Sequence, residues 1–339
     1  MRARAGLHHP VHGGPDAGGA VAHDFSTNAN ACGPCPIVVD ALRGVDASSY
    51  PDPHYTRLRE RLAAFHGVDP ERIVMAASAS EFMQRISALA ARAGLRHARV
   101  PLHGYGDYSR AADIWGLEIH HGDEIPPGPA LHWACEPASP LGTRDEAAAN
   151  WAGSSGTGDI RVLDCAYVPL RLDAQSLPMP AGAWQLWTPN KALALTGIRA
   201  AYAVAPSDVS LAHLNMLHGM SASWPVGAHG VAMLEHWPDG GVQDWLKSSL
   251  NTLRGWKSAQ IALCEEWGWS VVSGSLANYF AARLPPDCDA QRLHAALRSC
   301  GIKLRDCGSF GLPRHVRLGV LGPASQAVLA DGWFIGGFA

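Results

Sequence analysis

The chain has 339 residues, of which 47% are hydrophobic and 17% are charged, and its formal net charge at pH 7 is -3. This composition is typical of a globular protein, and the lack of a basic cluster excludes the electrostatic surface of a nucleic-acid-binding protein. The N-terminal residues lack the apolar core of a signal peptide, and no run approaches the roughly 18 apolar residues of a membrane span. We therefore expect a soluble, cytoplasmic protein with no nucleic-acid or membrane partner.

The predicted elements divide the chain into three parts. Residues 1-45 form a Gly/Pro-rich arm, residues 46-225 alternate short apolar runs with helical segments, and residues 226-339 hold a long connecting helix and a small C-terminal domain. This length is enough for one large domain and one smaller domain. We therefore predict a large domain over 46-225, which the arm precedes and the small domain follows.

The large domain begins with two helices separated by a strand. Residues 55–66 have helical periodicity, and Gly67 ends the pattern. The run Ile73–Ala76 is short and apolar, and Ser78–Glu81 has the spacing of a capping box that starts a helix reaching Gly94. Further apolar runs alternate with helical or loop segments, at about 98–102, 117–120, 130–134, 160–164, 184–188 and 200–204. This alternation favours a mainly parallel sheet that is covered on both faces.

The remaining elements follow a break at residues 219–225. A long helical stretch from about 227 to 266 is expected to lead into the small domain. That domain is expected to hold strands at 269–272, 278–284 and 315–320 and a helix at 290–299. We therefore predict an α+β unit at the C-terminal end of the chain.

The spacing of the cysteines does not indicate a metal site. Cys32-Gly33-Pro34-Cys35 has the spacing of a thioredoxin-type redox motif, but it follows a polar segment rather than a strand that ends in tryptophan. A zinc site would need a second pair of ligands, and we find none in the sequence. We therefore interpret the motif as a Gly-Pro turn and predict no metal site.

Lys191 is the strongest candidate for chemistry. It follows an apolar run that ends at Thr188, and Arg199 lies eight residues beyond it. A lysine in this setting suits an enzyme that holds an aldehyde cofactor as a Schiff base, because a nearby hydroxyl and guanidinium can bind the cofactor's phosphate. The pattern predicts an enzyme that acts on amines.

Two further candidates stand at predicted strand ends, where ligands of parallel α/β sheets bind. Ser78-Ala79-Ser80 opens a helix whose free N–H groups favour a phosphate, although a capping box is most often only a cap. Asp164 ends an apolar run, where a buried carboxylate needs a cationic partner such as a protonated pyridine nitrogen. A helix cap or a loop salt bridge is the alternative for Asp164. Tyr167 is close enough in sequence to reach the same ligand.

Taken together, these residues resemble the fold type I pyridoxal-phosphate enzymes of the aminotransferase superfamily, in the branch of histidinol-phosphate aminotransferase and L-threonine-O-3-phosphate decarboxylase. The segments that carry the resemblance are, in chain order, His12–Gly14, Asp24–Asn30, Tyr50–Pro53, Ser78–Glu81, Tyr105–Tyr108, Asp164–Tyr167, Thr188–Arg199 and Arg305–Leu312. The resemblance implies a three-layer aminotransferase-like α/β fold with a mainly parallel sheet in the large domain, a smaller α+β domain and an active homodimer.

The resemblance also implies a role for each candidate around pyridoxal 5'-phosphate. Lys191 would form the Schiff base and move protons at the substrate's α-carbon, while Asp164 would pair with the ring nitrogen. Tyr167 would bond the phenolic oxygen, and Tyr105 would stack on the ring. The implied phosphate ligands are Ser78, Ala79, Ser80, Thr188, Arg199 and, from the neighbouring subunit, Tyr50.

The implied substrate residues are fewer. Arg317 matches the arginine that grips the substrate's α-carboxylate with a bidentate fork. Arg305 either binds a carboxylate or distal phosphate or only supports the small domain, and Asn28 lies on the segment that lines the pocket. Ser139 stands where the family has an asparagine that donates to the phenolic oxygen, which a hydroxyl can do only after a shift or through water.

The resemblance implies an aminotransferase similar to histidinol-phosphate aminotransferase that acts on an amino acid or an amino phosphate. The alternative is an L-threonine-O-3-phosphate decarboxylase of cobalamin synthesis, which the His12–Gly14 and Arg305–Leu312 segments resemble. A third hypothesis, based on Ser139, is a cofactor-binding protein with lost or reduced turnover. Carboxylate orientation decides between the two reactions, because the bond perpendicular to the ring is the one that breaks.

Overall fold

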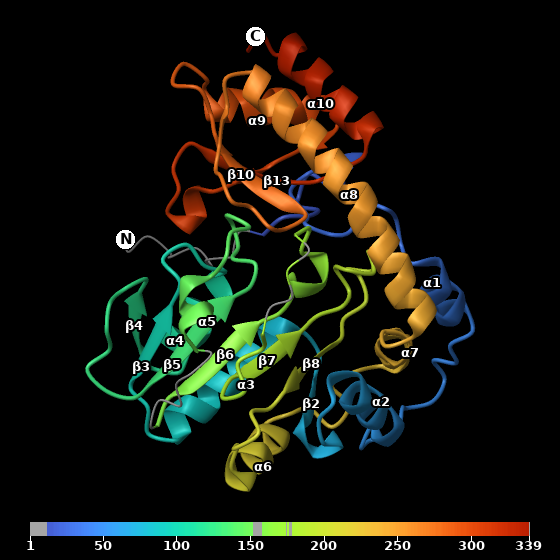
Figure 1. Cartoon of the computed structure of the whole chain (residues 1–339), viewed down its shortest axis with the longest axis vertical. Helices are drawn as coiled ribbons and strands as arrows, with labels where there is room; N and C mark the ends of the chain where they lie inside the picture. The colour runs from blue at the N-terminus through green and yellow to red at the C-terminus, as the bar shows by residue number, and fades with distance from the viewer. Residues whose placement is uncertain (1–11, 152–157, 174, 176–177, 339) are drawn as a thin grey trace, which may run out of the picture.

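A seven-stranded sheet forms the centre of the computed structural model, which describes residues 12–338 except 152–157, 174 and 176–177 (Figure 1). Its spatial order is β2-β8-β7-β6-β5-β3-β4. Strand β8 is antiparallel to both of its neighbours, and the other pairs are parallel. The strands are β2 (Ile73–Ala76), β3 (His97–Val100), β4 (Glu118–His121), β5 (Ala130–Cys135), β6 (Ile160–Asp164), β7 (Trp184–Trp187) and β8 (Ala201–Val204). The expected mainly parallel sheet is confirmed.

Helices cover both faces of this sheet, which explains why its strands bury apolar residues on both faces. Successive residues of β2 point to opposite faces: Ile73 belongs to one hydrophobic core and Val74 to the other. The helices are α2 (Thr56–His66), α3 (Ala79–Arg92), α4 (Gly106–Ile114), α5 (Glu146–Asn150), α6 (Leu211–Gly219) and α7 (Ala228–His236). Phe82 of α3 packs in one core and Leu62 of α2 in the other, so the large unit has three layers.

A second unit follows the long helix α8 (Gly240–Glu266), which runs from the large sheet to the smaller one in Figure 1. Its antiparallel sheet has the order β12-β13-β10-β9. The elements of this unit are β9 (Ser270–Val271), β10 (Tyr279–Arg283), α9 (Ala290–Ser299), β11 (Ile302–Lys303), β12 (Arg305–Asp306), β13 (His315–Gly319) and α10 (Pro323–Ile335). Its core includes a tryptophan cluster in which Trp267 stacks on Trp333.

The structure corrects the single helix expected over 227–266. That stretch forms two helices, α7 and α8, because Pro238 lies between them and a proline can neither donate the backbone hydrogen bond nor fit the preceding turn of a continuous helix. The sequence analysis also did not foresee α10, nor α1 (Pro36–Arg43) within the N-terminal part. Both helices start with a proline in the first turn, which is a helix-start signal.

The N-terminal segment lies between the two sheets and contacts both units. Strand β1 (His23–Asp24) pairs in parallel with β11 of the smaller unit. Further along, Asn30 N–H donates to the Lys191 carbonyl at 2.9 Å, and Cys35 N–H donates to the Leu193 carbonyl at 3.0 Å. The segment is therefore attached directly to the backbone that carries Lys191.

Two further expectations concern the cysteines and the membrane. Cys32 and Cys35 are free thiols on a turn that leads into α1, in keeping with the Gly-Pro turn. Within the described ranges, no helix has the length and apolar character that crossing a bilayer requires.

Candidate active site

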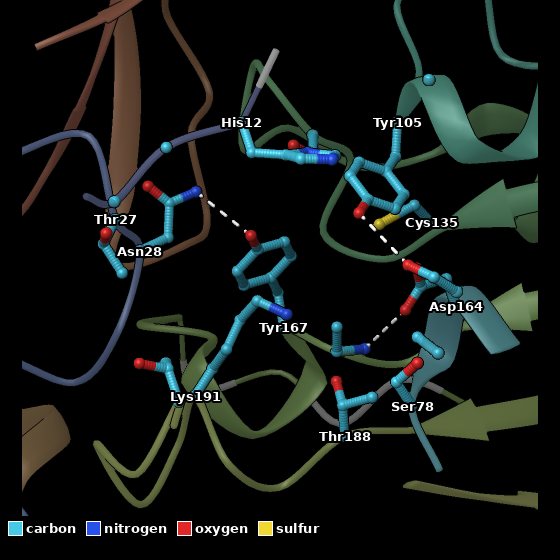
Figure 2. Close-up of a pocket in the computed structure, with 18 of the residues that line it drawn as sticks. His12, Thr27, Asn28, Ser78, Tyr105, Cys135, Asp164, Tyr167, Thr188 and Lys191 are labelled. Atoms are coloured by element: carbon cyan, nitrogen blue, oxygen red, sulfur yellow. Dashed lines mark hydrogen bonds between the residues drawn. The ribbon is translucent and has the colours of Figure 1, made fainter. Parts of the chain in front are cut away.

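A cavity of about 590 Å³ opens at the carboxyl ends of the parallel strands (Figure 2). The predicted site residues that line it are Asn28, Ser78, Ala79, Ser80, Tyr105, Ser139, Asp164, Tyr167, Thr188, Lys191, Arg199, Arg305 and Arg317. They come from the N-terminal segment, the large sheet and the smaller sheet. Tyr50 is the one predicted site residue that does not line it.

Lys191 supplies the amine of the cavity. It lies in the turn after β7, and its Nζ is 5.3 Å from the centre of the Tyr167 ring. Figure 2 shows the side chain pointing into the cavity below Tyr167. Among the described residues that line the cavity, it is the only lysine. The geometry therefore leaves one primary amine to attack a carbonyl carbon there.

Asp164 lies at the end of β6 with its carboxylate fixed on both oxygens. Oδ2 accepts a hydrogen bond of 2.7 Å from the Tyr108 hydroxyl, and Oδ1 accepts one of 2.9 Å from Ala166 N–H. Burial raises the pKa of Asp164, while the Tyr108 bond and the charge of Lys191 act to lower it. Because this carboxylate is only 5% exposed at a cavity wall, a cation that binds beside it in the cavity stabilises its charge.

Tyr108 is a functional residue that the sequence analysis did not assign. Its ring stacks on Trp133 at a centroid distance of 4.6 Å and an interplanar angle of 14°. Burial raises its pKa well above the usual value, so the hydroxyl stays protonated and donates to Asp164. The Tyr105–Tyr108 segment could have indicated Tyr108, since both tyrosines lie at the start of helix α4. Only Tyr105 was predicted to contact the cofactor.

One end of the cavity is built to hold an anion. Ser78 caps helix α3 by accepting a 3.1 Å hydrogen bond from Glu81 N–H, which leaves the first turn of the helix facing the cavity. The Thr188 hydroxyl is buried, and no described residue forms a hydrogen bond with it. Arg199 lines the same cavity. These groups are the donors that a phosphate requires.

Ser80 and Asp107 organise the neighbouring wall. The Ser80 hydroxyl donates to Asp107 Oδ2 at 2.6 Å, and Asp107 Oδ1 pairs with Arg110 at 2.8 Å. Arg110 also lines the cavity, although the sequence analysis did not select it. Asp107 offsets the positive charge of Arg110. Arg110 therefore adds hydrogen-bond donors to this wall of the cavity without a large excess of positive charge.

Arg317 on β13 also lines the cavity, and neighbouring residues fix its guanidinium. Its Nη1 donates to the Ser139 hydroxyl at 3.2 Å and its Nη2 to the Ser26 carbonyl at 2.9 Å. The guanidinium also lies 5.5 Å from the centre of the Tyr279 ring. These contacts hold the planar fork in one orientation, which suits bidentate binding of a carboxylate.

Arg305 on β12 is the neighbouring cation. It lies 4.7 Å from the centre of the Phe310 ring and donates to the Ser309 hydroxyl at 2.7 Å. Burial, and then the positive charge of Arg317, lower the pKa of Arg305 from its usual value. Two guanidinium groups on one wall attract an anionic substrate.

Asn28 and Tyr105 complete the walls. Asn28 Nδ2 lies 3.3 Å from the Tyr167 hydroxyl, to which it donates. Burial raises the pKa of Tyr105, whose ring lies 5.6 Å from His12, another lining residue that was not selected as a site residue. Together with Tyr167, these side chains give the cavity flat surfaces for a planar ring.

Tyr50 lies on the surface, apart from the cavity. Its side chain is 77% exposed and stacks on Trp224, with ring centroids 4.3 Å apart and an interplanar angle of 21°. Trp224 is itself 40% exposed. The predicted contact of Tyr50 with a phosphate in a neighbouring subunit stays a prediction.

Comparison with known proteins identifies the class of protein to which this fold and this cavity correspond. No protein-family model matches the chain. In solved structures, histidinol-phosphate aminotransferase from Sinorhizobium meliloti in complex with pyridoxal-5'-phosphate has a TM-score of 0.77, 21% identity, and coverage of 93% of this chain and 90% of that one. L-threonine-O-3-phosphate decarboxylase from Porphyromonas gingivalis has a TM-score of 0.76, 19% identity, and coverage of 92% and 98%. The fold is the expected fold type I aminotransferase fold.

Curated sequences extend this likeness to nearly the whole chain. Histidinol-phosphate aminotransferase from Ruegeria pomeroyi is 25% identical, over 91% of this chain and 89% of that protein. A protein provisionally named threonine-phosphate decarboxylase, from Caldanaerobacter subterraneus, is 38% identical over 93 residues, which are 27% of this chain and 24% of that protein. The resemblance inferred from the sequence is therefore confirmed: the homologues carry the names of both members of the predicted branch.

Proposed function

We propose that the chain is a pyridoxal-phosphate-dependent aminotransferase, similar to histidinol-phosphate aminotransferase, that acts on a small amino acid or amino phosphate. One observation carries the proposal: the amine of Lys191 and the buried carboxylate of Asp164 face one cavity that also has an anion-binding end. The homologues named above support the same activity.

The residues of the cavity fit the cofactor. Two groups suit the phosphate: the first turn of α3, and the buried Thr188 hydroxyl, which has no partner among the described residues. Asp164 suits a protonated ring nitrogen. Lys191 is the residue whose amine would hold the cofactor at its carbonyl carbon. Tyr105 and Tyr167 supply the aromatic walls.

When bound, pyridoxal phosphate withdraws electrons from the α-carbon of an amino substrate. Lys191 Nζ then serves as the base that takes the proton from that carbon and as the acid that returns it. Asp164 would stabilise a positive charge at the ring nitrogen, and Tyr108 holds Asp164 in place through its hydrogen bond. Arg317 would hold the carboxylate of an amino-acid substrate, and the orientation of that carboxylate would decide which bond at the α-carbon breaks.

Threonine-phosphate decarboxylation is the second candidate. The segment of 38% identity to the Caldanaerobacter protein supports it, as does the pair Arg305 and Arg317, which provides charge for both a carboxylate and a second anionic group. A cofactor-binding protein without turnover is the third. We rank transamination first, because the named homologues that span most of the chain are aminotransferases.

Product identification tests the three proposals. The cofactor-loaded protein is incubated with histidinol phosphate and 2-oxoglutarate, with other amino donors, and with threonine phosphate. Formation of glutamate from 2-oxoglutarate is the expected result. Carbon dioxide release from threonine phosphate without glutamate formation would establish the alternative. Absorbance that no amino substrate perturbs would contradict both enzymatic proposals.

We further propose that the enzyme is a homodimer that works in the cytoplasm. The exposed stack of Tyr50 on Trp224 supports the first point, because such aromatic surfaces are typical of protein interfaces. The eight free cysteines support the second, since thiols stay reduced in that compartment. Light scattering of purified protein at twice the monomer mass is the expected result.

Ser139→Asn is expected to restore the amide that the family carries at this position. The amide of an asparagine reaches further than the serine hydroxyl, so its carbonyl oxygen can accept the hydrogen bond from Arg317 while its N–H donates to the cofactor's phenolic oxygen. A hydrogen bond to a charged oxygen stabilises by about 1.5–3 kcal/mol, so the pH midpoint of the cofactor's visible absorbance change should fall by about 1–2 units. Ser139→Ala, which adds no amide, should leave this midpoint within about 0.3 units. Equal midpoints for both variants would contradict the role of position 139.

A further inference from the structure

A second group of chemically active side chains lies far from the cavity, at the β3–β4 edge of the large sheet. Strand β3 begins at His97 and strand β4 at Glu118 (Figure 1). In their parallel register, His97 lies opposite Glu118, and His120 lies two residues further along β4. Because alternate residues of a strand share a face and register partners point the same way, all three side chains project from one face.

The ligand atoms of these residues are spaced as a tetrahedral metal ion requires. His97 Nδ1 is 3.1 Å from His120 Nε2 and 3.4 Å from Glu118 Oε2, and all three atoms lie within 4.8 Å of one another. Zinc bonds to nitrogen and carboxylate oxygen are about 2.0–2.2 Å long, and a tetrahedral angle then places neighbouring ligand atoms about 3.3–3.5 Å apart. Both measured separations are close to this value.

Few protons lie between the three ligand atoms. A neutral His97 has at most one proton on Nδ1, which it can donate to His120 or to Glu118, and if the proton lies on His120 instead, His97 Nδ1 turns a lone pair toward the carboxylate. A divalent cation between the three atoms attracts all of them at once.

We propose that His97, Glu118 and His120 form a Zn²⁺ site, with water as the fourth ligand. Two imidazoles and one carboxylate are a donor set that zinc favours. In the described part of the chain β4 pairs only with β3, so the ion joins the edge strand to the sheet. The site lies at the start of these strands, whereas the cavity lies at strand ends, so we assign it a stabilising role separate from the proposed reaction.

The surroundings leave the site accessible to an ion. The Glu118 side chain is 68% exposed, and His97 and His120 are partly exposed. Arg99, the register partner of His120, is a cation on this face. Its guanidinium donates to the Gly122 carbonyl at 2.7 Å and lies 3.5 Å from Asp123, so its charge is partly offset beyond the far end of β4. The prediction of no metal site from the sequence did not consider pairs of residues across strands.

Zinc titration of the chelator-treated, cofactor-loaded protein tests the site. Calorimetry is expected to give a dissociation constant that weakens at least about 100-fold in His120→Ala, because even residues behind the ligands account for about 10–100-fold. At free zinc 100 times the dissociation constant, the melting temperature should rise by roughly 4 °C in the wild type and stay unchanged in His120→Ala.

His121→Ala is the matched control, because His121 is an exposed histidine on the same strand with its side chain on the other face. It should bind zinc like the wild type. Glu118→Gln should weaken binding in the same direction as His120→Ala. The proposal is overturned if His120→Ala and His121→Ala bind zinc equally, or if zinc leaves the wild-type melting temperature unchanged. Transaminase activity does not enter this readout, so the two proposals fail independently.

Discussion

Lys191→Ala is expected to produce a folded, colourless protein whose turnover falls by about 10⁴-fold. The substitution removes the only lysine among the described residues that line the cavity, and with it both the covalent link to the cofactor and the proton-transfer group. A positioned acid–base group accounts for up to about 10⁴-fold in rate. The visible absorbance of the cofactor-loaded protein and the rate of glutamate formation are the two measurements.

Two further variants serve as controls. One tests whether a positive charge at position 191 is enough, and the other tests the nonspecific effect of removing a lysine. Lys191→Arg keeps a cation over the Tyr167 ring but has no amine that forms a Schiff base, so it should also be colourless and inactive. Lys247→Ala removes an exposed lysine of α8, whose side chain is 76% exposed, and should keep both colour and rate. A Lys191→Ala protein that stays yellow after removal of free cofactor would overturn the assignment.

Much of the fold was predictable because the local signals agree with the tertiary structure. Ile160, Val162 and Leu163 of β6 are buried because both faces of the strand are covered, and Ser78 marks the start of α3 through its hydroxyl. The resemblance selected the site residues, and the fold explains their proximity. Lys191 and Asp164 follow neighbouring parallel strands, whose carboxyl ends meet at one edge.

What could not be predicted depends on contacts between distant residues. The hydrogen bond from Tyr108 to Asp164 connects helix α4, which packs against β3 and β4, with the end of β6, and the bond from Arg317 to Ser139 joins the small sheet to the loop after β5. No local periodicity encodes either distance. The pairing of His97 with Glu118 depends on the register of β4, a short edge strand, against β3, which a hydrophobic pattern does not specify.

The same reasoning makes Asp164→Asn the sharper test of the proposed chemistry. Asparagine has nearly the same shape, and its carbonyl oxygen can still accept a hydrogen bond from Tyr108 or Ala166, so the fold and cofactor binding should persist. The negative charge that favours a protonated ring nitrogen is lost. We expect kcat to fall by about 10³-fold, which corresponds to about 4 kcal/mol of activation free energy.

Asp145→Asn is the matched control for this experiment. Asp145 is also a buried aspartate that accepts backbone hydrogen bonds, but it caps α5 and does not line the cavity, so its replacement should lower the melting temperature and leave kcat within about threefold. A cofactor methylated on its ring nitrogen carries a permanent positive charge there. If Asp164 acts by holding that charge, this cofactor should restore turnover to Asp164→Asn and not to Lys191→Ala. Failure to restore Asp164→Asn would contradict the proposal that Asp164 acts by holding a positive charge at the ring nitrogen.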